Sequence, residues 1–538
     1  MKKALSLLLI LISAAAYAQL PVPDDFLSKD FHKGRREALR QLLPANSVMA
    51  VFASPPRNFA NDVDYKYHAN PDLYYFSGYT EPNAVLLIFK EAQKDGDGQS
   101  YSELFFVQKK DAAREQWTGK RLGVEGVKQQ LGFSHVYNSA EFRDFPLDLT
   151  KFSSIIFEFP QDIADKLGQS DDTYDLTQSF RKKSGMPDDF DVAVVANLAS
   201  LTRSPEIASD DVSRPGLIKY YQSLAAGNER YKANAFVKRL INVKDSLEMS
   251  AFLNDIKTLK WNSALYTLYT NQLRQIKTSE ELVLMRKAID ISALAHNEAM
   301  KAVKPGMSEL ELQGVQEFIH KKLGAEYVGY PSIVGAGNNG CVLHYIENNV
   351  TQVGNKMVLM DVGAEYHGYT ADVTRTFPAN GKFTSEQKQI YDIVYQAQEA
   401  VFKICKEGTT FRQIEKTARD VVTDGLVKLG ILKDATANRL YYPHGCSHFL
   451  GLDVHDKGIY DSLFENMIIT VEPGVYIPEG SDCDKKWWGM AVRIEDDVLI
   501  GKQKGEILSI KAPRKSGDVE KMASQKSFVD DIKLEKIK

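Results

Sequence analysis

Cysteine is scarce in this sequence, and the few cysteines form no recognisable metal or redox motif. Cys341, Cys405, Cys446 and Cys483 lie far apart among 538 residues, and no CxxC pair occurs. This spacing excludes the common cysteine-based zinc sites and thioredoxin-like redox motifs. A chain of this length can bury enough apolar surface to fold without disulfides, so we expect four free thiols.

An excess of either charge is also lacking. Lysine and arginine number 67 against 71 aspartates and glutamates, which gives a formal net charge of −4. This mild acidity argues against nucleic acid as a partner. Internal repeats and low-complexity segments are missing as well, and the length predicts two or three globular domains.

Long hydrophobic runs are missing except at the N-terminus. The first residues, MKKALSLLLILISAAAYAQ, combine Lys2 and Lys3 with an apolar run over 4–12 and the tripeptide Ala-Tyr-Ala at 16–18. This pattern predicts a signal peptide over residues 1–18, because the apolar run is too short to span a bilayer. We expect an exported bacterial protein, periplasmic or extracellular, with no membrane contact after the signal peptide is removed.

The rest of the chain divides into two patterned regions. Residues 19–275 alternate helix-like and strand-like segments, which predicts an α/β domain with a helical insertion or linker at about 162–270. Its predicted strands are SVMAVFA, AVLLIF, ELFFV and SSIIFEF, and its first predicted helix is FHKGRREALRQLL. We expect a second domain over 276–515 and a C-terminal tail over 516–538.

The second domain contains an unusual pair of aspartates in the stretch MDVGAEYHGYTADVTRTFP. Asp361 follows the apolar run KMVLM, and Asp372 precedes the strand-like VTRTF. A hairpin turning at Tyr366 and His367 would bring the two carboxylates face to face, about 5 Å apart at Cβ. A carboxylate in a buried strand costs several kcal/mol unless something neutralises it. The pair therefore predicts a cation between them.

Two glutamates repeat this arrangement farther along the chain. Glu472 ends the apolar run of MIITVEPGVYIP, and Glu495 interrupts the strand-like GMAVRIEDDVLI. A long hairpin centred near Cys483 would place Glu472 opposite Glu495. The second pair has the same need for positive charge as the first.

Three of the ten histidines lie between the two acidic pairs, in HGCSHFLGLDVHD. A lone histidine is more often a packed or surface residue than a ligand, but His444, His448 and His455 cluster within twelve residues. Arg375 and Arg493 could neutralise one or two of the four carboxylates, but not all of them. Four carboxylates and an imidazole form an oxygen-rich site that suits a pair of divalent ions, with manganese, cobalt, iron or zinc as candidates.

These stretches, in the order DVGAEYHGYTADVTRTFP, HGCSHFLGLDVHD, TVEPGVYIP and VRIEDD, resemble the pita-bread metallopeptidases, and among them the Xaa-Pro aminopeptidase (aminopeptidase P) family. The resemblance is strong over 270–520. It is weaker in YKYHANPDLYYFSGYTEPNAVLLIF, which is similar to the N-terminal domain of that family. The resemblance implies an α/β N-terminal domain followed by an α+β pita-bread catalytic domain, in which helices cover a curved antiparallel sheet.

Carried over by position, the resemblance implies five metal ligands and two divalent ions, with manganese as the metal expected first. Asp361 would bind one ion, and His448 and Glu472 would be associated with the other. Asp372 and Glu495 would bridge the two ions. Glu472 would also be the general base.

The resemblance further implies residues that surround the substrate. His344 matches an additional active-site histidine, and His455 matches the one that steadies the carbonyl and the tetrahedral oxyanion. His444 and Arg493 match supporting positions.

The implied activity is release of the N-terminal residue from peptides with proline at the second position, by hydroxide activated at two metal ions. Prolidase, which cleaves only Xaa-Pro dipeptides, would have the same ligands and stays open as an alternative. A non-catalytic peptide-binding protein on the same fold is a further alternative, although such relatives typically lose metal ligands and all five positions are filled here. A homodimer also stays open.

Overall fold

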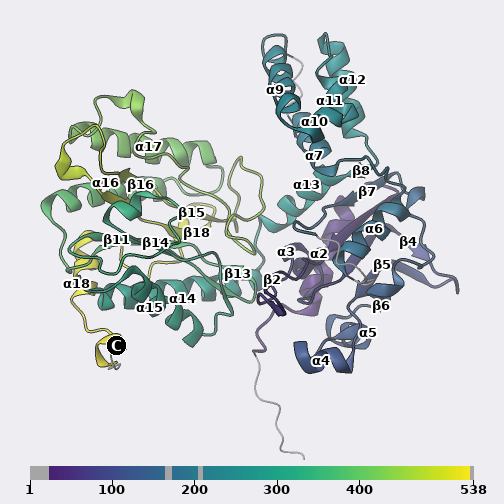
Figure 1. Ribbon diagram of the computed structural model, residues 1–538, viewed down its shortest axis with the longest axis horizontal. Helices are drawn as coiled ribbons and strands as arrows, with labels where there is room; N and C mark the ends of the chain where they lie inside the picture. The colour runs from purple at the N-terminus through teal and green to yellow at the C-terminus, as the bar shows by residue number, and fades with distance from the viewer. Residues whose placement is uncertain (1–22, 164–171, 204–209, 533–538) are drawn as a thin grey trace, which may run out of the picture.

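The computed structural model describes residues 23–163, 172–203 and 210–532. In Figure 1 these residues form two blocks, an N-terminal one coloured purple to teal and a C-terminal one coloured green to yellow, with α13 (Ser263–Arg274) between them. The predicted signal peptide lies outside the described residues. Among the residues that are described, none of the helices has the length and apolarity needed to cross a bilayer.

A mixed six-stranded sheet forms the centre of the N-terminal block. Its strand order is β6-β5-β4-β1-β7-β8, with β4 antiparallel to both β1 and β5 and the remaining pairs parallel. The strands are β1 (Ser47–Phe52), β4 (Val85–Lys94), β5 (Ser100–Val107), β6 (Val136–Asn138), β7 (Ser154–Phe157) and β8 (Trp261–Asn262). The four strands predicted from the sequence are confirmed. Alternate residues of β1 belong to two separate apolar clusters, so both faces of the sheet are covered.

The N-terminal block also contains five α-helices, α2 to α6, in the part of the chain before residue 185 that the structure describes. α2 (Lys29–Leu42) confirms the first predicted helix, and it begins where the Ser28 hydroxyl accepts a hydrogen bond from the backbone N–H of Phe31. The others are α3 (Pro71–Ser77), α4 (Ala112–Thr118), α5 (Gly123–Gly126) and α6 (Thr173–Ser184), with a small ribbon of β2 (Asn58–Ala60) and β3 (Val63–Asp64) before α3.

Among the described residues, five α-helices form a projection that extends away from the N-terminal sheet (Figure 1). They are α7 (Val192–Ser200), α9 (Arg214–Gly227), α10 (Glu229–Ala233), α11 (Ala235–Leu240) and α12 (Ser246–Lys257). They pack around a small core of their own that includes Leu198, Tyr221 and Phe252. The projection falls within the segment expected to be a helical insertion or linker.

Antiparallel strands between two layers of helices form the C-terminal block. Figure 1 shows α14 and α15 on one side of the strands and α16 and α17 on the other. The helices are α14 (Ser279–Ala302), α15 (Glu309–Lys322), α16 (Ser385–Phe402), α17 (Phe411–Lys428) and α18 (Ser516–Ala523). The strands are β9 (Tyr327–Val328), β10 (Ile333–Ala336), β11 (Met357–Val362), β12 (Ala364–Tyr366), β13 (Tyr369–Thr370), β14 (Val373–Pro378), β15 (Ile468–Val471), β16 (Gly474–Ile477), β17 (Met490–Arg493), β18 (Asp496–Ile500) and β19 (Gly505–Ile507).

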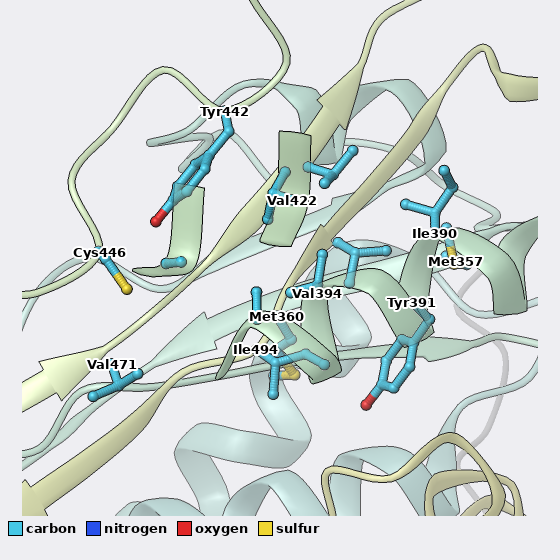
Figure 2. Close-up of a cluster of buried hydrophobic side chains, with 14 of the residues drawn as sticks. Met357, Met360, Ile390, Tyr391, Val394, Val422, Tyr442, Cys446, Val471 and Ile494 are labelled. Carbon is cyan, nitrogen blue, oxygen red and sulfur yellow. The ribbon is translucent and has the colours of Figure 1, made fainter. Parts of the chain in front are cut away.

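The helices α16 and α17 fix the strands through a continuous apolar core. Figure 2 shows Val394 of α16 and Val422 of α17 in one cluster with Met360 of β11 and with Ile494. Each such buried side chain contributes about 1.5–3 kcal/mol to folding. Cys446 belongs to the same core, and it and the other three cysteines are free, as predicted.

The first hairpin of this block turns one residue later than predicted. His367 and Gly368 occupy the two central positions of the turn, with φ values of +50° and +85°. This left-handed backbone characterises a two-residue hairpin turn and suits glycine at the second position. Asp361 consequently pairs with Thr374, so the predicted face-to-face pairing of Asp361 with Asp372 is wrong.

The second hairpin has the predicted register. β15 pairs with β18 and β16 pairs with β17 in one common register, which places Glu472 opposite Glu495. The two hairpins meet where the backbone N–H of Glu495 donates to the carbonyl of Thr374 at 3.0 Å. Two acidic strand ends therefore come together in the middle of the block.

The first described residues of the chain return to the turn of the first hairpin. Phe26 stacks on the ring of His367 with centroids 3.7 Å apart. The Asp25 carboxylate lies 2.8 Å from His367 Nε2 and accepts a hydrogen bond of 2.8 Å from the hydroxyl of Tyr366. The segment before α2 is thus attached to the C-terminal block.

Candidate active site

The two hairpins bring the predicted acidic ligands and His448 into one region. Asp361 lies in β11, Asp372 directly precedes β14, Glu472 follows β15, and Glu495 directly precedes β18. Ligand atoms of Asp372, His448 and Glu495 all lie within 4.8 Å of one another. Glu472 borders this group, because its Oε1 is 3.5 Å from His448 Nε2.

Positive side chains do not balance these acids. Arg493 reaches the site, with its Nη2 2.5 Å from Asp361 Oδ2 and its Nε 3.9 Å from Glu495 Oε2. Arg375 does not, because its Nη2 pairs with Asp496 Oδ1 at 2.6 Å. One arginine therefore faces four carboxylates.

Burial and mutual repulsion raise the pKa values of three of the acids. Burial, followed by the charge of Asp361, raises the pKa of Asp372, and burial, followed by Asp372, raises the pKa of Glu495 well above its usual range. Burial also raises the pKa of Glu472 to about 7. The fold disfavours four ionised carboxylates unless positive charge enters the site. A set of carboxylate oxygens with one imidazole fits divalent metal ions, so these residues suit such a group.

His448 presents one ring nitrogen to the acids. Its Nδ1 lies 3.0 Å from the carbonyl oxygen of Phe449, which fixes the proton on that nitrogen in the neutral ring. Its Nε2 lies 3.4 Å from Asp372 Oδ2, where it can accept a cation. Burial lowers the pKa of His448, but Asp372 and Glu472 outweigh burial and raise it to about 9.

Of the other three predicted histidines, His444 borders the acids and His455 borders His448. His444 Nδ1 is 3.4 Å from Glu472 Oε2, and the ring of His455 packs edge-on against His448 with centroids 4.3 Å apart. His344 is exposed, and it lies near enough to His455 for a charge on it to lower the pKa of that ring. Burial lowers the pKa of His444 to about 3 and that of His455 to about 4, so both rings are neutral at pH 7.

Tyr330 is a site residue that the sequence did not reveal. Its hydroxyl lies 2.5 Å from Asp361 Oδ1 and 2.6 Å from Asp372 Oδ1, so one hydroxyl group contacts both aspartates. Burial, with the charges of these acids, raises the pKa of Tyr330 well above its usual range and keeps the hydroxyl protonated. A side chain at the preceding Gly329 would collide with Thr370, and this close approach carries Tyr330 to the acids.

Two further hydroxyl groups support the predicted residues. The Thr374 hydroxyl donates to Glu495 Oε2 at 2.6 Å. The Tyr476 hydroxyl lies 2.7 Å from His444 Nε2 and accepts a hydrogen bond of 2.9 Å from Arg493 Nη1. Tyrosine and threonine are frequent in strands, so neither residue stood out in the sequence.

A groove of about 1070 Å³ lies between the two blocks and reaches Tyr330. Its N-terminal wall includes Tyr67, His68 and Asp72, and its C-terminal wall includes Glu365. His68 Nε2 lies 2.7 Å from Glu365 Oε2 and links the two walls. Tyr330, which contacts Asp361 and Asp372, lines this groove, so the groove lies next to the acidic residues.

The comparisons with known proteins agree with this geometry. Residues 283–502 match the family model for metallopeptidase family M24, and residues 32–156 match that for the aminopeptidase P N-terminal domain. An Xaa-Pro aminopeptidase of Escherichia coli (strain K12) is 31% identical over 506 residues, which cover 92% of this chain and 97% of that protein. The chain belongs to metallopeptidase family M24.

Several relatives are named Xaa-Pro aminopeptidase, and solved structures of aminopeptidase P match more than nine-tenths of the chain. An Xaa-Pro aminopeptidase of Haemophilus influenzae is 30% identical and covers 92% of this chain and 97% of its own length. The structure of E. coli aminopeptidase P with the inhibitor Pro-Leu has a TM-score of 0.70 at 29% identity, covering 93% of this chain and 98% of that one. Proline aminopeptidase P II from Yersinia pestis also has a TM-score of 0.70, at 28% identity, covering 93% and 100%.

Membership of family M24 confirms the expected fold class and the expected kind of enzyme. The chain has an aminopeptidase P N-terminal domain followed by a pita-bread catalytic domain, and it is a metallo-aminopeptidase, a hydrolase. The family implies divalent metal ions, and the cluster of Asp372, His448 and Glu495 offers a place for them.

Proposed function

We propose that this protein is exported and removes the N-terminal residue from peptides with proline in the second position. The convergence of four carboxylates, one imidazole and a single arginine in a buried hairpin junction supports the proposal most strongly. Relatives named Xaa-Pro aminopeptidase, similar over nearly the whole chain, support the choice of substrate. The signal-like N-terminal sequence supports export to the periplasm or beyond.

Asp361, Asp372, His448, Glu472 and Glu495 would hold two divalent ions, with manganese first among the candidates and cobalt, iron or zinc as alternatives. When bound, such a pair polarises the scissile carbonyl and supplies hydroxide near neutral pH. Tyr330 would keep Asp361 and Asp372 at a fixed spacing, and Arg493 would orient Asp361 through the 2.5 Å contact to Oδ2.

The other polar residues would handle protons and charge on the substrate. Glu472 would accept a proton from the attacking water and transfer it to the imino nitrogen of proline as the C–N bond breaks. His455, neutral at pH 7, would donate a hydrogen bond to the carbonyl oxygen as negative charge develops there. His344 would line the same space, and His444 would steady Glu472 from a distance of 3.4 Å.

A pair of substrates tests the proposal. The mature protein would be assayed on Xaa-Pro and Xaa-Pro-Yaa-Yaa with manganese, with a chelator-treated sample and Xaa-Ala-Yaa-Yaa as controls. We expect cleavage of Xaa-Pro-Yaa-Yaa but not of Xaa-Ala-Yaa-Yaa, and we expect the chelator to abolish this cleavage. Cleavage of the dipeptide only would identify a prolidase, and cleavage of neither with metal bound would indicate a non-catalytic protein. Sequencing of the secreted N-terminus should begin at Gln19.

A further inference from the structure

A second cluster of buried charges lies at the junction of the two blocks, beside the segment that carries His455. Its centre is Arg274, the last residue of α13. Arg274 Nη1 lies 2.7 Å from Asp72 Oδ1 and Nη2 lies 2.7 Å from Asp453 Oδ2, and the same guanidinium contacts Asp456. The side chains of Asp72, Arg274 and Asp456 are only 4%, 2% and 1% exposed.

Two lysines complete this junction cluster. Lys277 Nζ lies 2.8 Å from Asp456 Oδ2, and its side chain is fully buried with that of its partner. Lys457 Nζ lies 2.6 Å from Asp72 Oδ2 and 3.2 Å from Glu158 Oε2. Asp72 and Glu158 come from the N-terminal block, whereas Asp456 and Lys457 come from the catalytic domain. The cluster thus bridges the two blocks.

The segment 451–457 is folded around these charges. A Cβ atom at Gly451 would lie 2.0 Å from Asp456 Oδ2 and 2.8 Å from Lys277 Nζ, so the backbone itself packs against the cluster. The backbone N–H of Asp456 donates to the carbonyl of Phe449 at 2.9 Å, which closes the segment into a compact loop. His455 sits on this loop, next to one of the clustered acids. Its ring position therefore depends on how the loop is held.

Positive side chains offset most of the acids in the junction cluster: Arg274, Lys277 and Lys457 face Asp72, Asp453, Asp456 and Glu158. Burial alone would raise the pKa values of Asp72 and Asp456, but the neighbouring lysine and arginine side chains hold both below their usual range. Matched, buried charges have one favourable arrangement, and removing one partner leaves another uncompensated. The cluster is therefore suited to fixing the geometry of the loop.

We infer that Asp72, a residue of the N-terminal block, is a positioning residue for peptide cleavage: through Arg274 and Lys457 it holds the segment 451–457 and so places His455 beside His448. This rests on the proposed function only in the role given to His455. The mechanical link between Asp72 and the loop rests on the contacts alone. The N-terminal block then influences the reaction through the position of His455.

The kinetic test compares Asp72→Asn with a matched control, Glu103→Gln. Glu103 pairs with the buried Arg36 at 2.7 Å, and both residues lie within the N-terminal block, away from the loop. Asp72→Asn should lower kcat on Xaa-Pro-Yaa-Yaa by about 10–100-fold, because a small misplacement of an active-site group costs that much. KM and bound manganese should stay unchanged, and the control should behave as wild type. A loss of metal, or an equal loss in the control, would overturn the inference.

A double-variant cycle tests whether Asp72 acts through His455. If it does, Asp72→Asn combined with His455→Ala should lose no more activity than His455→Ala alone. Multiplicative losses would mean that Asp72 supports activity by another route and would overturn the inference.

A structural measurement separates this inference from the proposed function. Amide hydrogen exchange over 451–457 should be faster in Asp72→Asn than in wild type, while exchange in α16 stays unchanged. Lys457→Met, at the edge of the cluster where the lysine side chain is 21% exposed, serves as a second variant if Asp72→Asn does not fold. If wild type cleaves neither peptide, the proposed function fails, but hydrogen exchange still tests whether Asp72 holds the segment 451–457. Unchanged exchange over 451–457 in both variants would overturn the inference.

Discussion

Two buried clusters of carboxylates differ in the side chains that surround them and in the direction in which their pKa values are shifted. At the junction of the blocks, Asp72 and Asp456 face Arg274 and lysines, and their pKa values are lowered. In the hairpin site, Asp372 and Glu495 face mainly other acids, and their pKa values are raised. Burial of acids is thus common to the ion-paired junction cluster and to the predicted metal site, and the number of neighbouring positive side chains distinguishes them.

The difference arises from where the arginines point. Arg375 lies in β14, three residues after Asp372, yet it pairs with Asp496 and donates to the carbonyl of Ala512. Arg274 instead reaches three aspartates from the end of a helix. The hairpin site therefore has less arginine and lysine charge, with Arg493, than the junction, which has Arg274 and two lysines.

The largest expected effect comes from removing one charge in the hairpin site. Asp372→Asn should reduce cleavage of Xaa-Pro-Yaa-Yaa by at least about 1000-fold, the scale for losing a charged group that acts in the transition state. The circular dichroism spectrum should not change, because the amide has the same shape as the carboxylate. Full activity of this variant with metal bound would refute the assignment of Asp372 as a ligand.

Removing a charge from the junction should instead affect stability. Asp456→Asn should lower the free energy of unfolding at pH 7 by about 3–5 kcal/mol, because Arg274 and Lys277 lose a buried partner. The pKa of Asp456 is lowered by folding, so its contribution is present above the ordinary aspartate value of about 3.9 and is lost as pH falls below it. The gap between variant and wild type in urea unfolding should therefore narrow below pH 4. Asp482→Asn, at an exposed ion pair, is the control and should show no change.

Tyr330→Phe should have an intermediate effect on the hairpin site. The variant loses the hydroxyl that contacts Asp361 and Asp372, and such supporting groups typically contribute about 10–100-fold to metal affinity or activity. Calorimetric titration with manganese measures the affinity directly. Tyr345→Phe is a matched control, because its hydroxyl donates to Glu309 at 2.9 Å in the same domain without contacting a predicted ligand. Equal affinities in the two variants would show that Tyr330 has no special role.

The smallest effect should have the opposite sign. In the presence of chelator, Glu495→Gln should stabilise the protein at pH 8 by on the order of 1 kcal/mol, since each unit of pKa shift corresponds to about 1.4 kcal/mol. The pKa of Glu495 is raised by folding, so wild type loses stability as pH rises above the ordinary glutamate value of about 4.3. The gain in melting temperature should be smaller at pH 5. Added manganese should make wild type the more stable protein, because wild type then has the complete ligand set. A variant that is less stable than wild type in chelator at pH 8 would contradict the argument that the buried acids repel one another.

Much of the hairpin site could be predicted from the sequence, because acids that end apolar runs are locally visible. Glu472 and Glu495 were placed opposite each other correctly, since their hairpin is regular on both sides of the pair. The pairing of Asp361 with Asp372 was predicted wrongly, because the centre of the turn depends on whether His367 adopts a left-handed backbone. That choice depends on distant contacts, such as the Phe26 ring on His367.

The junction cluster and Tyr330 could not be predicted, for a related reason. Asp72 and Lys457 are 385 residues apart, and each looks like an ordinary charged residue in its own segment. Their pairing follows from how two domains dock, which no local period encodes. Tyr330 likewise gains its role only when β11 and β14 bring Asp361 and Asp372 to the same hydroxyl.

The attachment of Asp25 and Phe26 to the hairpin turn has a consequence for the order of folding. Asp25 meets His367, 342 residues farther along the chain. Contacts of such long separation form late because the intervening chain must be ordered first. Docking of this segment should therefore be among the last folding events, and the stacking of Phe26 on His367 marks a catalytic domain that has finished folding.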